Sequence, residues 1–449
     1  MFVVYYTQEV MAMQIDFTRL KPRDYYLNKL ISFKDTEPVK VITGIRRCGK
    51  SSIMKLMIRH LLESGIDESQ ILYMNFESME YSDMTAKQLY QYVQKRRPQD
   101  KRYYLFFDEV QRIIDWQDAI NSFRVDFLCD IYVTGSNAYL LSSELATYLS
   151  GRYVEIKMLP LSFSEFISFH GYAVTERTGL TGKPSKQISD SSGNVFTAEE
   201  MFEAYLKFGG MPGIADIGLD WDNTLTILDG IYSTVVTRDI LEREKRRGQR
   251  QITDAELLRR IVRFLADNIG NNVSMTTIAN TLFNEGLVEN SRTAKPAVQT
   301  VQAYVGALME SFVFYETKRY DIKGRDYLRT LGKYYIVDIG LRNYLLGLRD
   351  SDTGHIIENV VYFELLRRGY DIAIGKIGDT EVDFIATTAD EKTYYQVTLN
   401  MQDESTCERE LRPLKQIRDN YEKIVLTLDR NLITSYDGIK VVNLIDWLM

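Results

Sequence analysis

A phosphate-binding sequence follows the first strand-like run of the chain. Residues 44–51 read GIRRCGKS and match the pattern G-x-x-x-x-G-K-[ST] at every fixed position. Glycines let backbone N–H groups curve around phosphate oxygens, and the start of a helix adds partial positive charge. Lys50 would reach the β- and γ-phosphates, and the Ser51 hydroxyl would bind Mg²⁺. The pattern predicts a site for ATP and Mg²⁺, and its expected nucleotide-binding residues are Gly44, Ile45, Arg46, Arg47, Cys48, Gly49, Lys50, Ser51 and Ser52.

Two acidic residues end a second apolar run, YYLFFDE at 103–109. A strand buried on both faces is not expected to end in paired carboxylates without a use for them. Beside a phosphate loop, Asp108 would hold the Mg²⁺ shell and Glu109 would be the general base that activates water. The alternative is an ordinary solvated strand end, which the nearby phosphate loop makes the weaker interpretation.

Two further residues are weaker candidates for catalysis. Asn137 follows Thr134 and Ser136 at the end of the run at 130–136, where a polar side chain would hydrogen-bond the attacking water or the γ-phosphate. A helix N-cap at Ser136 or Asn137 explains the same sequence equally well. Arg152 would stabilise transition-state charge as an arginine finger, although an ordinary surface arginine fits its position at least as well.

Five apolar runs predict the strands that position these residues. The runs are almost continuous, as in strands that are buried on both faces of a parallel sheet. Between the first two runs, apolar residues recur at helical spacing from Ile53 to Leu61. Alternation of strands and helices predicts an α/β fold with right-handed crossovers. The predicted strands are residues 39–43, 71–76, 103–109, 130–136 and 152–158.

Length and composition limit the class of protein. The 449 residues are too many for one compact core and predict two to four domains. No run approaches the ~20 apolar residues that cross a bilayer, so no membrane partner is expected. The net charge of −7 leaves a local basic patch as the only form that nucleic-acid contact can take. The 3 cysteines are widely spaced and odd in number, which fits a reducing, cytoplasmic environment.

Taken together, these motifs resemble the AAA+-like P-loop ATPases of the type with an additional strand and a catalytic glutamate. More narrowly, the chain resembles a prokaryotic family that joins such a core to a C-terminal region known only as a domain of unknown function. The likeness covers residues 15–449, and its most specific segments are LPLSFSEF (159–166), GGMP (209–212) and EVDF (381–384). The resemblance implies a cytoplasmic ATPase with a middle winged-helix segment and a nuclease-like C-terminal fold. It implies no particular substrate.

Five parts are expected along the chain. A lead-in at 1–38 precedes a P-loop ATPase core at 39–175, which an AAA+-like parallel sheet would organise. A helical lid with a mobile loop at 176–250 precedes a winged-helix-like domain at 251–350. A restriction-endonuclease-like α/β domain at 351–449 completes the chain.

The winged-helix interpretation rests on two short helices and a possible hairpin after residue 274. Four residues of the second helix would face base edges, and four basic residues of the hairpin would lie near phosphates. The helix residues are Gln299, Thr300, Gln302 and Tyr304, and the hairpin residues are Lys318, Arg319, Lys323 and Arg325. Any DNA contact is therefore expected within residues 240–330, where a second basic cluster lies at 243–250. The alternative is a helical lid that packs on protein and contacts no DNA.

The C-terminal part resembles the restriction-endonuclease-like fold, whose pattern is Glu on a helix, Asp on a strand and Glu-x-Lys on the next strand. Glu358 and Asp383 match this pattern, whereas Gln396 and Thr398 replace its last Glu and Lys. Gln is a poorer Mg²⁺ ligand than Glu, and Thr has no positive charge. We therefore expect a remnant that keeps the shape without the chemistry and serves as a binding platform.

Three functions stay open on this evidence. The first is an ATPase that acts near DNA as a motor or remodeler. The second is a nucleotide-dependent signalling switch that binds a protein partner, for which the C-terminal domain is the candidate surface. The third is an ATP-gated DNA nuclease. The first two share their motifs, so the sequence does not separate them.

Overall fold

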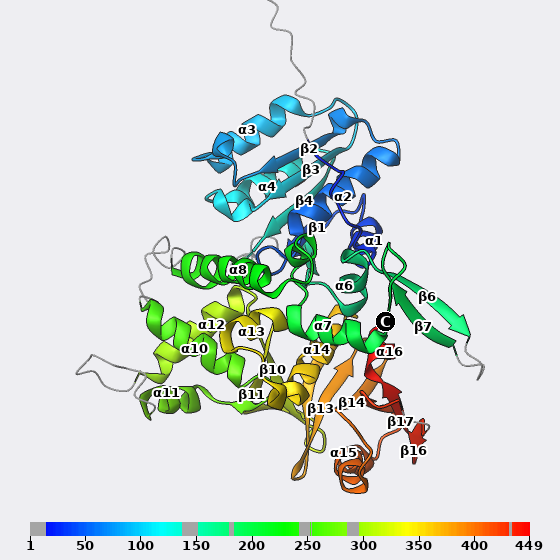
Figure 1. The fold of residues 1–449 in the computed structure, drawn as a ribbon. Helices are drawn as coiled ribbons and strands as arrows, with labels where there is room; N and C mark the ends of the chain where they lie inside the picture. Colours follow the sequence, from blue (N-terminus) through cyan, green and yellow to red (C-terminus); the bar gives the residue numbers. More distant parts are fainter. Residues whose placement is uncertain are drawn as a thin grey trace, which may run out of the picture. The chain divides into compact units, whose positions relative to one another are not determined.

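The computed structural model describes residues 15–136, 151–178, 184–241, 252, 254–284, 296–430 and 433–449. The chain divides into two compact units, which appear in Figure 1. One unit comprises Met1–Gly44 and Gly49–Met158, and the other comprises Ile45–Cys48 and Leu159–Met449. Each unit has a main sheet of its own, with five strands in the first and nine in the second among the described residues.

A parallel sheet forms the centre of the first unit. Its strand order is β2-β3-β4-β1-β5, and every pairing in it is parallel. The strands are Val39–Thr43 (β1), Ile71–Asn75 (β2), Tyr103–Asp108 (β3), Cys129–Gly135 (β4) and Tyr153–Lys157 (β5). They agree with the five predicted runs to within one residue at each end, so the predicted parallel α/β sheet is confirmed.

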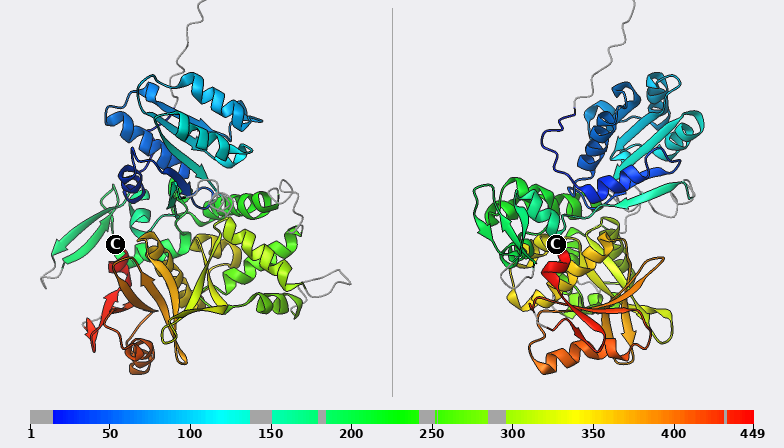
Figure 2. Two further views of the ribbon diagram at one scale, coloured as in Figure 1. Left: turned by 180° about the vertical axis from the view of Figure 1, so that it is seen from behind. Right: turned by 90° about the vertical axis from the view of Figure 1, so that its right-hand side faces the viewer.

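Helices cover both faces of this sheet (Figure 2). On one face, Leu105 and Phe107 of β3 share an apolar cluster with residues of α3 and α4. The buried side chains of α2 lie outside that cluster and belong to the other face, together with α1. The helices are Asp24–Ser32 (α1), Lys50–Glu63 (α2), Ala86–Arg96 (α3) and Trp116–Asp126 (α4), with short 3₁₀ turns at Glu68–Gln70 (η1), Met79–Tyr81 (η2) and Val110–Arg112 (η3).

A mixed sheet organises the second unit, in the order β16-β17-β15-β14-β13-β12-β10-β11-β9. β10 and β11 form an antiparallel hairpin, as predicted, and β10 also pairs in parallel with β12. The sheet therefore runs across residue 350, where the sequence predicts a domain boundary. The strands are Asn272–Val273 (β9), Phe314–Asp321 (β10), Asp326–Ile336 (β11), Asp371–Ile377 (β12), Thr380–Thr387 (β13), Lys392–Thr398 (β14), Glu422–Thr427 (β15), Ser435–Tyr436 (β16) and Ile439–Asn443 (β17).

Two helices of this unit pack against different residues of the sheet. Tyr362 of α14 (Thr353–Arg367) stacks on Tyr335 with ring centroids 4.3 Å apart. Leu414 of α15 (Glu404–Gln416) instead joins an apolar cluster with Val382 and Tyr394. The unit also contains α6 (Phe163–Phe169), α7 (Ala198–Phe208), η5 (Pro212–Asp216), α8 (Trp221–Tyr232), the π-helix η6 (Ser233–Asp239), α10 (Ala255–Asp267), α11 (Met275–Asn284), α12 (Val298–Glu310), α13 (Ile339–Leu346), η7 (Asp350–Asp352) and α16 (Leu444–Leu448). Across the described part of the chain, no helix combines the length and the apolar character that crossing a membrane requires.

Strands replace much of the loop that the sequence predicts within 176–250. β6 (Ala173–Thr178), β7 (Pro184–Ser189) and β8 (Val195–Phe196) form a small antiparallel sheet. Ile188 of β7 is fully buried, so one apolar side chain anchors a polar strand. The segment is rich in Ser and Gly, which hides the alternation that normally indicates a strand. The helical part of this prediction corresponds to α7 and α8.

The predicted outward face of α12 needs one correction. Gln299 and Gln302 are exposed, as expected for residues that could contact a ligand. Tyr304 is instead buried, and its hydroxyl oxygen accepts a hydrogen bond from the N–H of Asp254 at 3.0 Å. Asp254 caps the start of α10, so Tyr304 packs α12 against α10 rather than facing outward.

A close backbone contact explains the GGMP sequence. A Cβ atom added to Gly210 would lie 2.5 Å from the carbonyl oxygen of Leu161, whose N–H donates to Gly210 O at 2.7 Å. Gly209 has a φ of 77°, and a Cβ there would lie 2.5 Å from an Asp338 carboxylate oxygen. Only glycine fits both positions. The contact joins the LPLSFSEF and GGMP segments within one unit.

We predict that Gly210→Ala destabilises the protein by about 1–3 kcal/mol, because the extra methyl forces the two backbones apart. The free energy of unfolding, measured with a chemical denaturant, tests this. Gly213→Ala is the matched control, since an added Cβ there meets nothing within 4 Å. The control should change stability by less than about 0.5 kcal/mol. Equal stability of the two variants would contradict the contact.

Candidate active site

The phosphate loop connects the end of β1 to the start of α2, which is the predicted strand–loop–helix context. Three of its residues have positive φ: Gly44 at 143°, Arg47 at 66° and Gly49 at 103°. A Cβ on Gly49 would lie 3.2 Å from the Met158 side chain, so this position favours glycine for both conformation and space. The loop therefore turns sharply before the helix begins.

Lys50 is the first residue of α2 and is 4% exposed. Its Nζ donates to the carbonyl oxygen of Gly44 at 3.0 Å, which places the ammonium across the loop. Ser51 is half-buried in the first helical turn, and Ser52 is exposed. The ammonium thus lies against the backbone that is expected to surround the phosphates.

The four residues between the two glycines differ in their surroundings. Ile45 and Cys48 are fully buried. Arg46 Nη1 lies 3.1 Å from Asp239 Oδ2 in η6, and both side chains are partly exposed. Arg46 is therefore paired with an acid of η6. Arg47 is the residue other than glycine that has a positive φ in this loop.

Asp108 is fully buried at the end of β3, where two hydroxyl groups orient its carboxylate. Tyr73 donates to Oδ2 at 2.9 Å, and Thr134 donates to Oδ1. Burial and the Asp108 charge both raise the pKa of Tyr73, so its hydroxyl stays protonated and donates. The Thr134 hydroxyl oxygen also accepts from the N–H of Glu109 at 2.9 Å. One threonine on β4 thus positions both acids.

Glu109 adopts φ 55° and ψ 47°, a left-handed conformation that is uncommon outside glycine. Its Oε2 accepts hydrogen bonds from Ser136 Oγ at 3.2 Å and from Gln111 Nε2. Ser136 follows β4, the strand between β1 and β3. The carboxylate is therefore held at the end of the strand that separates it from the phosphate loop.

The two weaker candidates have different outcomes. Asn137 lies outside the described residues, and its role stays a prediction. Arg152 is exposed directly before β5, and its carbonyl oxygen accepts from the N–H of Val39 at 2.9 Å. Val39 begins β1, whereas the phosphate loop follows the other end of that strand. The structure therefore does not bring Arg152 to the phosphate loop of its own chain.

A second group of charged residues is buried in the other unit. Lys333 Nζ lies 2.9 Å from Glu358 Oε1 on α14 and 2.9 Å from Glu381 Oε1 on β13. Tyr335 also donates to Glu358 Oε1, at 2.7 Å. Burial lowers the pKa of Lys333, but the surrounding carboxylates outweigh it and raise that pKa. One ammonium thus pairs with two carboxylates.

Asp383 and Gln396 lie on the neighbouring strands β13 and β14. Burial and the Glu358 charge raise the pKa of Asp383 well above its ordinary value, and its Oδ2 accepts from the N–H of Val397 at 2.8 Å. Gln396 Nε2 donates to Glu410 Oε2 at 3.0 Å. Its Oε1 is buried and finds no hydrogen-bond partner among the described residues. Glu358 and Asp383 therefore form one electrostatic group, while the Gln396 amide has a partner on α15.

Sequence reasoning missed Lys333, because the residue lies on β11 and nothing in its local sequence indicates an acidic neighbour. Two other lysines, Lys376 and Lys392, are closer in sequence to Asp383. Lys392 Nζ instead lies 4.9 Å from the ring centroid of Tyr394. Among the residues that the structure describes, no group of three or more His, Cys, Asp or Glu side chains is arranged to hold a metal ion.

Family models match two parts of the chain. One, described as an AAA domain, matches residues 36–167, and another, described as a domain of unknown function, matches residues 199–352. An uncharacterized protein of Haemophilus influenzae is 40% identical over 430 residues, which are 95% of this chain and 98% of that protein. An uncharacterized protein of Methanocaldococcus jannaschii is 28% identical over 392 residues, which are 85% and 79% of the two chains.

The matches to solved structures are weaker. A Walker-type ATPase of Pyrococcus abyssi is 16% identical with a TM-score of 0.46, over 72% of this chain and 95% of that chain. Orc1 of Aeropyrum pernix, solved in complex with DNA, is 11% identical with a TM-score of 0.27, over 72% and 91% of the two chains. At these scores the likeness carries no argument about function, which rests instead on the AAA match and the site geometry.

Proposed function

This chain belongs to the same family as the Haemophilus influenzae protein and contains an AAA domain, and from that premise we propose that it hydrolyses ATP with Mg²⁺. One observation carries the proposal. The phosphate loop and the Asp108–Glu109 pair stand at the carboxyl ends of strands in one parallel sheet, and Thr134 on the strand between them orients both acids.

Phosphate binding falls to the loop backbone and to Lys50. Glycines at 44 and 49 leave room for phosphate oxygens beside the backbone N–H groups. The Lys50 ammonium, which donates to Gly44 O, would turn to the β- and γ-phosphate oxygens. The start of α2 adds partial positive charge at the same place.

Mg²⁺ fits the oxygen donors of this site. Ser51 offers a hydroxyl in the first turn of α2, and Asp108 offers a carboxylate at the end of β3. Hard oxygen ligands of this kind, completed by phosphate oxygens and water, are what Mg²⁺ prefers. When bound, the ion neutralises the charge that develops on the phosphates.

Glu109 would take the proton from the attacking water. Ser136 and Gln111 hold its carboxylate, and its left-handed backbone turns it away from the strand direction. A positioned general base contributes about 10²–10⁴-fold to a rate. Removing the base while keeping its shape therefore separates hydrolysis from nucleotide binding.

We predict that Lys50→Ala removes ATP binding, because it deletes the mobile positive charge that reaches the β- and γ-phosphates. Glu109→Gln should keep ATP affinity and lose about 10²-fold or more in kcat, since an amide takes no proton from water. Equilibrium binding of a fluorescent ATP analogue and steady-state phosphate release measure the two effects.

Lys87→Ala is the control for these variants, because Lys87 is exposed on α3 of the same unit and outside the proposed site. It should leave ATP binding and turnover unchanged. Wild-type affinity in a folded Lys50→Ala protein would contradict the phosphate site. Wild-type kcat in Glu109→Gln would assign the base to another residue.

A DNA contact within residues 240–330 is the second candidate function. We propose that α11, α12 and the β10–β11 hairpin act as a winged helix, with the hairpin beside the phosphate backbone. Lys318, Lys323 and Arg325 are exposed on the hairpin. Arg319 is half-buried and lies 3.7 Å from Glu381, so it is held within the sheet. We therefore do not include it among the residues proposed to contact DNA. The basic cluster at 243–250 lies outside the described residues.

We expect the triple change of Lys318, Lys323 and Arg325 to Ala to flatten the salt dependence of duplex binding. Each lost phosphate contact removes about 0.9 from the slope of log affinity against log salt concentration. Fluorescence anisotropy over a range of salt concentrations measures this slope. Arg319→Ala is the matched control and should leave the slope unaltered. An identical slope in the triple variant would move the contact away from the hairpin.

The C-terminal part is proposed as a binding platform that resembles a nuclease in shape and does not cleave DNA. Its order of α14, three strands, α15 and β15 fits the resemblance. Lys333 already neutralises Glu358, and Gln396 donates to Glu410. Because burial and the Glu358 charge raise the pKa of Asp383 and so disfavour its ionised form, it would be a weaker ligand for a cation.

We predict that the purified protein leaves supercoiled and linear DNA intact in Mg²⁺ and in Mn²⁺. Agarose electrophoresis after prolonged incubation measures this, with Asp383→Ala prepared by the same procedure as the control. Cleavage that is present in the wild type and absent from the variant would overturn the prediction and favour the ATP-gated nuclease.

A further inference from the structure

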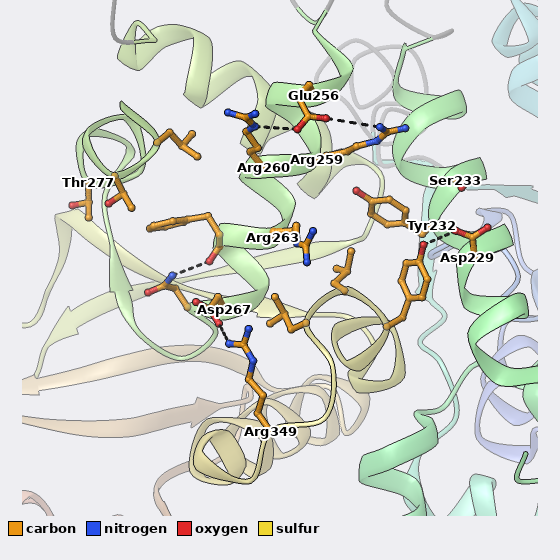
Figure 3. A pocket seen from close by; sticks show the side chains of 17 residues that line it. Asp229, Tyr232, Ser233, Glu256, Arg259, Arg260, Arg263, Asp267, Thr277 and Arg349 are labelled. Atoms are coloured by element: carbon orange, nitrogen blue, oxygen red, sulfur yellow. Dashed lines mark hydrogen bonds and ion pairs between the residues drawn. The ribbon is translucent and has the colours of Figure 1, made fainter. Parts of the chain in front are cut away.

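A cavity of about 1120 Å³ opens in the second unit (Figure 3). Its walls come from α8, α10, α11 and α13, and all of its lining residues fall within 229–349. That range lies inside the match to the domain of unknown function, at residues 199–352. None of the lining residues belongs to the phosphate loop or to the buried group around Glu358, so the cavity needs an explanation of its own.

Arginine dominates the charge of this cavity. Four arginines line it, against the three carboxylates of Asp229, Glu256 and Asp267, which leaves a surplus of one positive charge in a protein of net charge −7. Three of the arginines come from one side of α10, and the fourth follows α13. They are Arg259, Arg260, Arg263 and Arg349.

The arginines differ in how fully they are paired. Arg260 Nε lies 3.0 Å from Glu256, and Arg259 Nη1 lies 3.8 Å from the same carboxylate. Arg349 pairs with Asp267. Arg263 is exposed and forms no ion pair with the described residues, and Figure 3 shows it between the other walls of the cavity. A guanidinium fork is therefore left for an anion.

The existing ion pairs are weak competitors for such an anion. Exposed pairs of this kind contribute about 0–1 kcal/mol each, since water screens them and ordering the side chains costs entropy. A phosphate that accepts two parallel hydrogen bonds from one guanidinium gains more and fixes its geometry. The arrangement therefore favours a phosphate over the side-chain carboxylates already present.

Two aromatic rings stand beside the arginines. The rings of Tyr232 and Tyr344 have centroids 5.8 Å apart and an interplanar angle of 49°. Burial raises the pKa of Tyr232 to about 12, while the charges of Arg259 and Arg263 oppose that rise. Tyr344 donates to Asp229, which fixes its ring. Tyr232 is buried and Tyr344 is half-buried, so a planar ring next to a bound phosphate would pack mainly against Tyr344, which Tyr232 supports from behind.

We propose that this cavity binds a phosphate that carries a planar ring, which is the chemistry of a nucleotide. Arg263 and Arg259 hold the phosphate, and the wall of Tyr232 and Tyr344 holds the base. The nucleotide is either free or part of a single strand of nucleic acid. This second site is separate from the ATP site and stands whether or not ATP is hydrolysed.

Two probes without β- and γ-phosphates test the cavity and avoid the contacts expected of the phosphate loop. Thymidine monophosphate represents the free nucleotide, and a labelled 15-nucleotide oligothymidylate represents a strand. Titration calorimetry and fluorescence anisotropy measure their binding to the full chain. Arg263→Ala should weaken binding of at least one probe by about tenfold or more, the size expected for losing a hydrogen bond to a charged group. The affinity of Arg263→Lys should lie between those of the wild type and Arg263→Ala, because lysine keeps the positive charge and loses the forked hydrogen bonding of the guanidinium group.

Arg412→Ala is the matched control, since Arg412 is exposed on α15 and does not line the cavity. Arg259→Ala is a second test, and thermal melting confirms that each variant is folded. If the arginine variants bind both probes more weakly, a mononucleotide is sufficient for binding. If they bind only the oligomer more weakly, the ligand is a strand. Failure of both probes to bind the wild type at millimolar concentration overturns the proposal. It is also overturned if Arg263→Ala and Arg259→Ala both bind the probes like the wild type. This holds even if the triple change of Lys318, Lys323 and Arg325 to Ala removes binding of the oligomer.

Discussion

The candidate chemistry of the first unit depends on the parallel pairing of β1, β4 and β3. Parallel strands end at the same edge, so the register that sets Thr43 beside Gly135 and Phe107 beside Val133 also fixes where the loop and the acids begin. β4 lies between the phosphate loop and the acids. Thr134 on β4 holds the two acids together, because its hydroxyl donates to Asp108 and accepts from the N–H of Glu109. A side chain without both hydrogen-bonding capacities would leave either a buried carboxylate or a backbone donor unsatisfied.

Carboxylates are also buried in the second unit, where a lysine rather than hydroxyl groups compensates them. Carboxylates taken out of water need a compensating charge, which a nuclease obtains from metal ions and this chain obtains from Lys333. A cation that entered between Glu358 and Asp383 would have to displace that ammonium and bind the ionised form of Asp383, which the raised pKa of that carboxyl disfavours. Both steps cost free energy, and Gln396 returns little because its amide is neutral and donates to Glu410. On the proposal of a binding platform that does not cleave DNA, the fold keeps a stable group of charges at the expense of metal affinity.

Much of the first unit could be predicted from the sequence, because its signals are local. Apolar runs mark the five buried strands, and the phosphate loop and the Asp108–Glu109 pair follow two of them directly. The rest depends on pairings between distant residues. The sequence around Arg319 does not show that Glu381 on β13 lies beside it. The sequence around Lys333 likewise does not show its pairing with Glu358 on α14. Tyr304 reads as an outward residue because the period of a helix does not say which face its neighbours cover.

The two basic surfaces within residues 199–352 differ in physical character. Lys318, Lys323 and Arg325 stand in solvent, where salt screens a charge over about 10 Å, so attraction at the hairpin fades as ionic strength rises. The arginines of the cavity stand beside aromatic rings, so one ligand could contact a guanidinium group and a ring together. Exposed charges of the first kind hold a backbone of any sequence, whereas a guanidinium fork beside a ring selects a ligand by shape. Contact with a strand at both places would therefore combine a weak, salt-sensitive hold on the backbone with a more selective hold on one nucleotide.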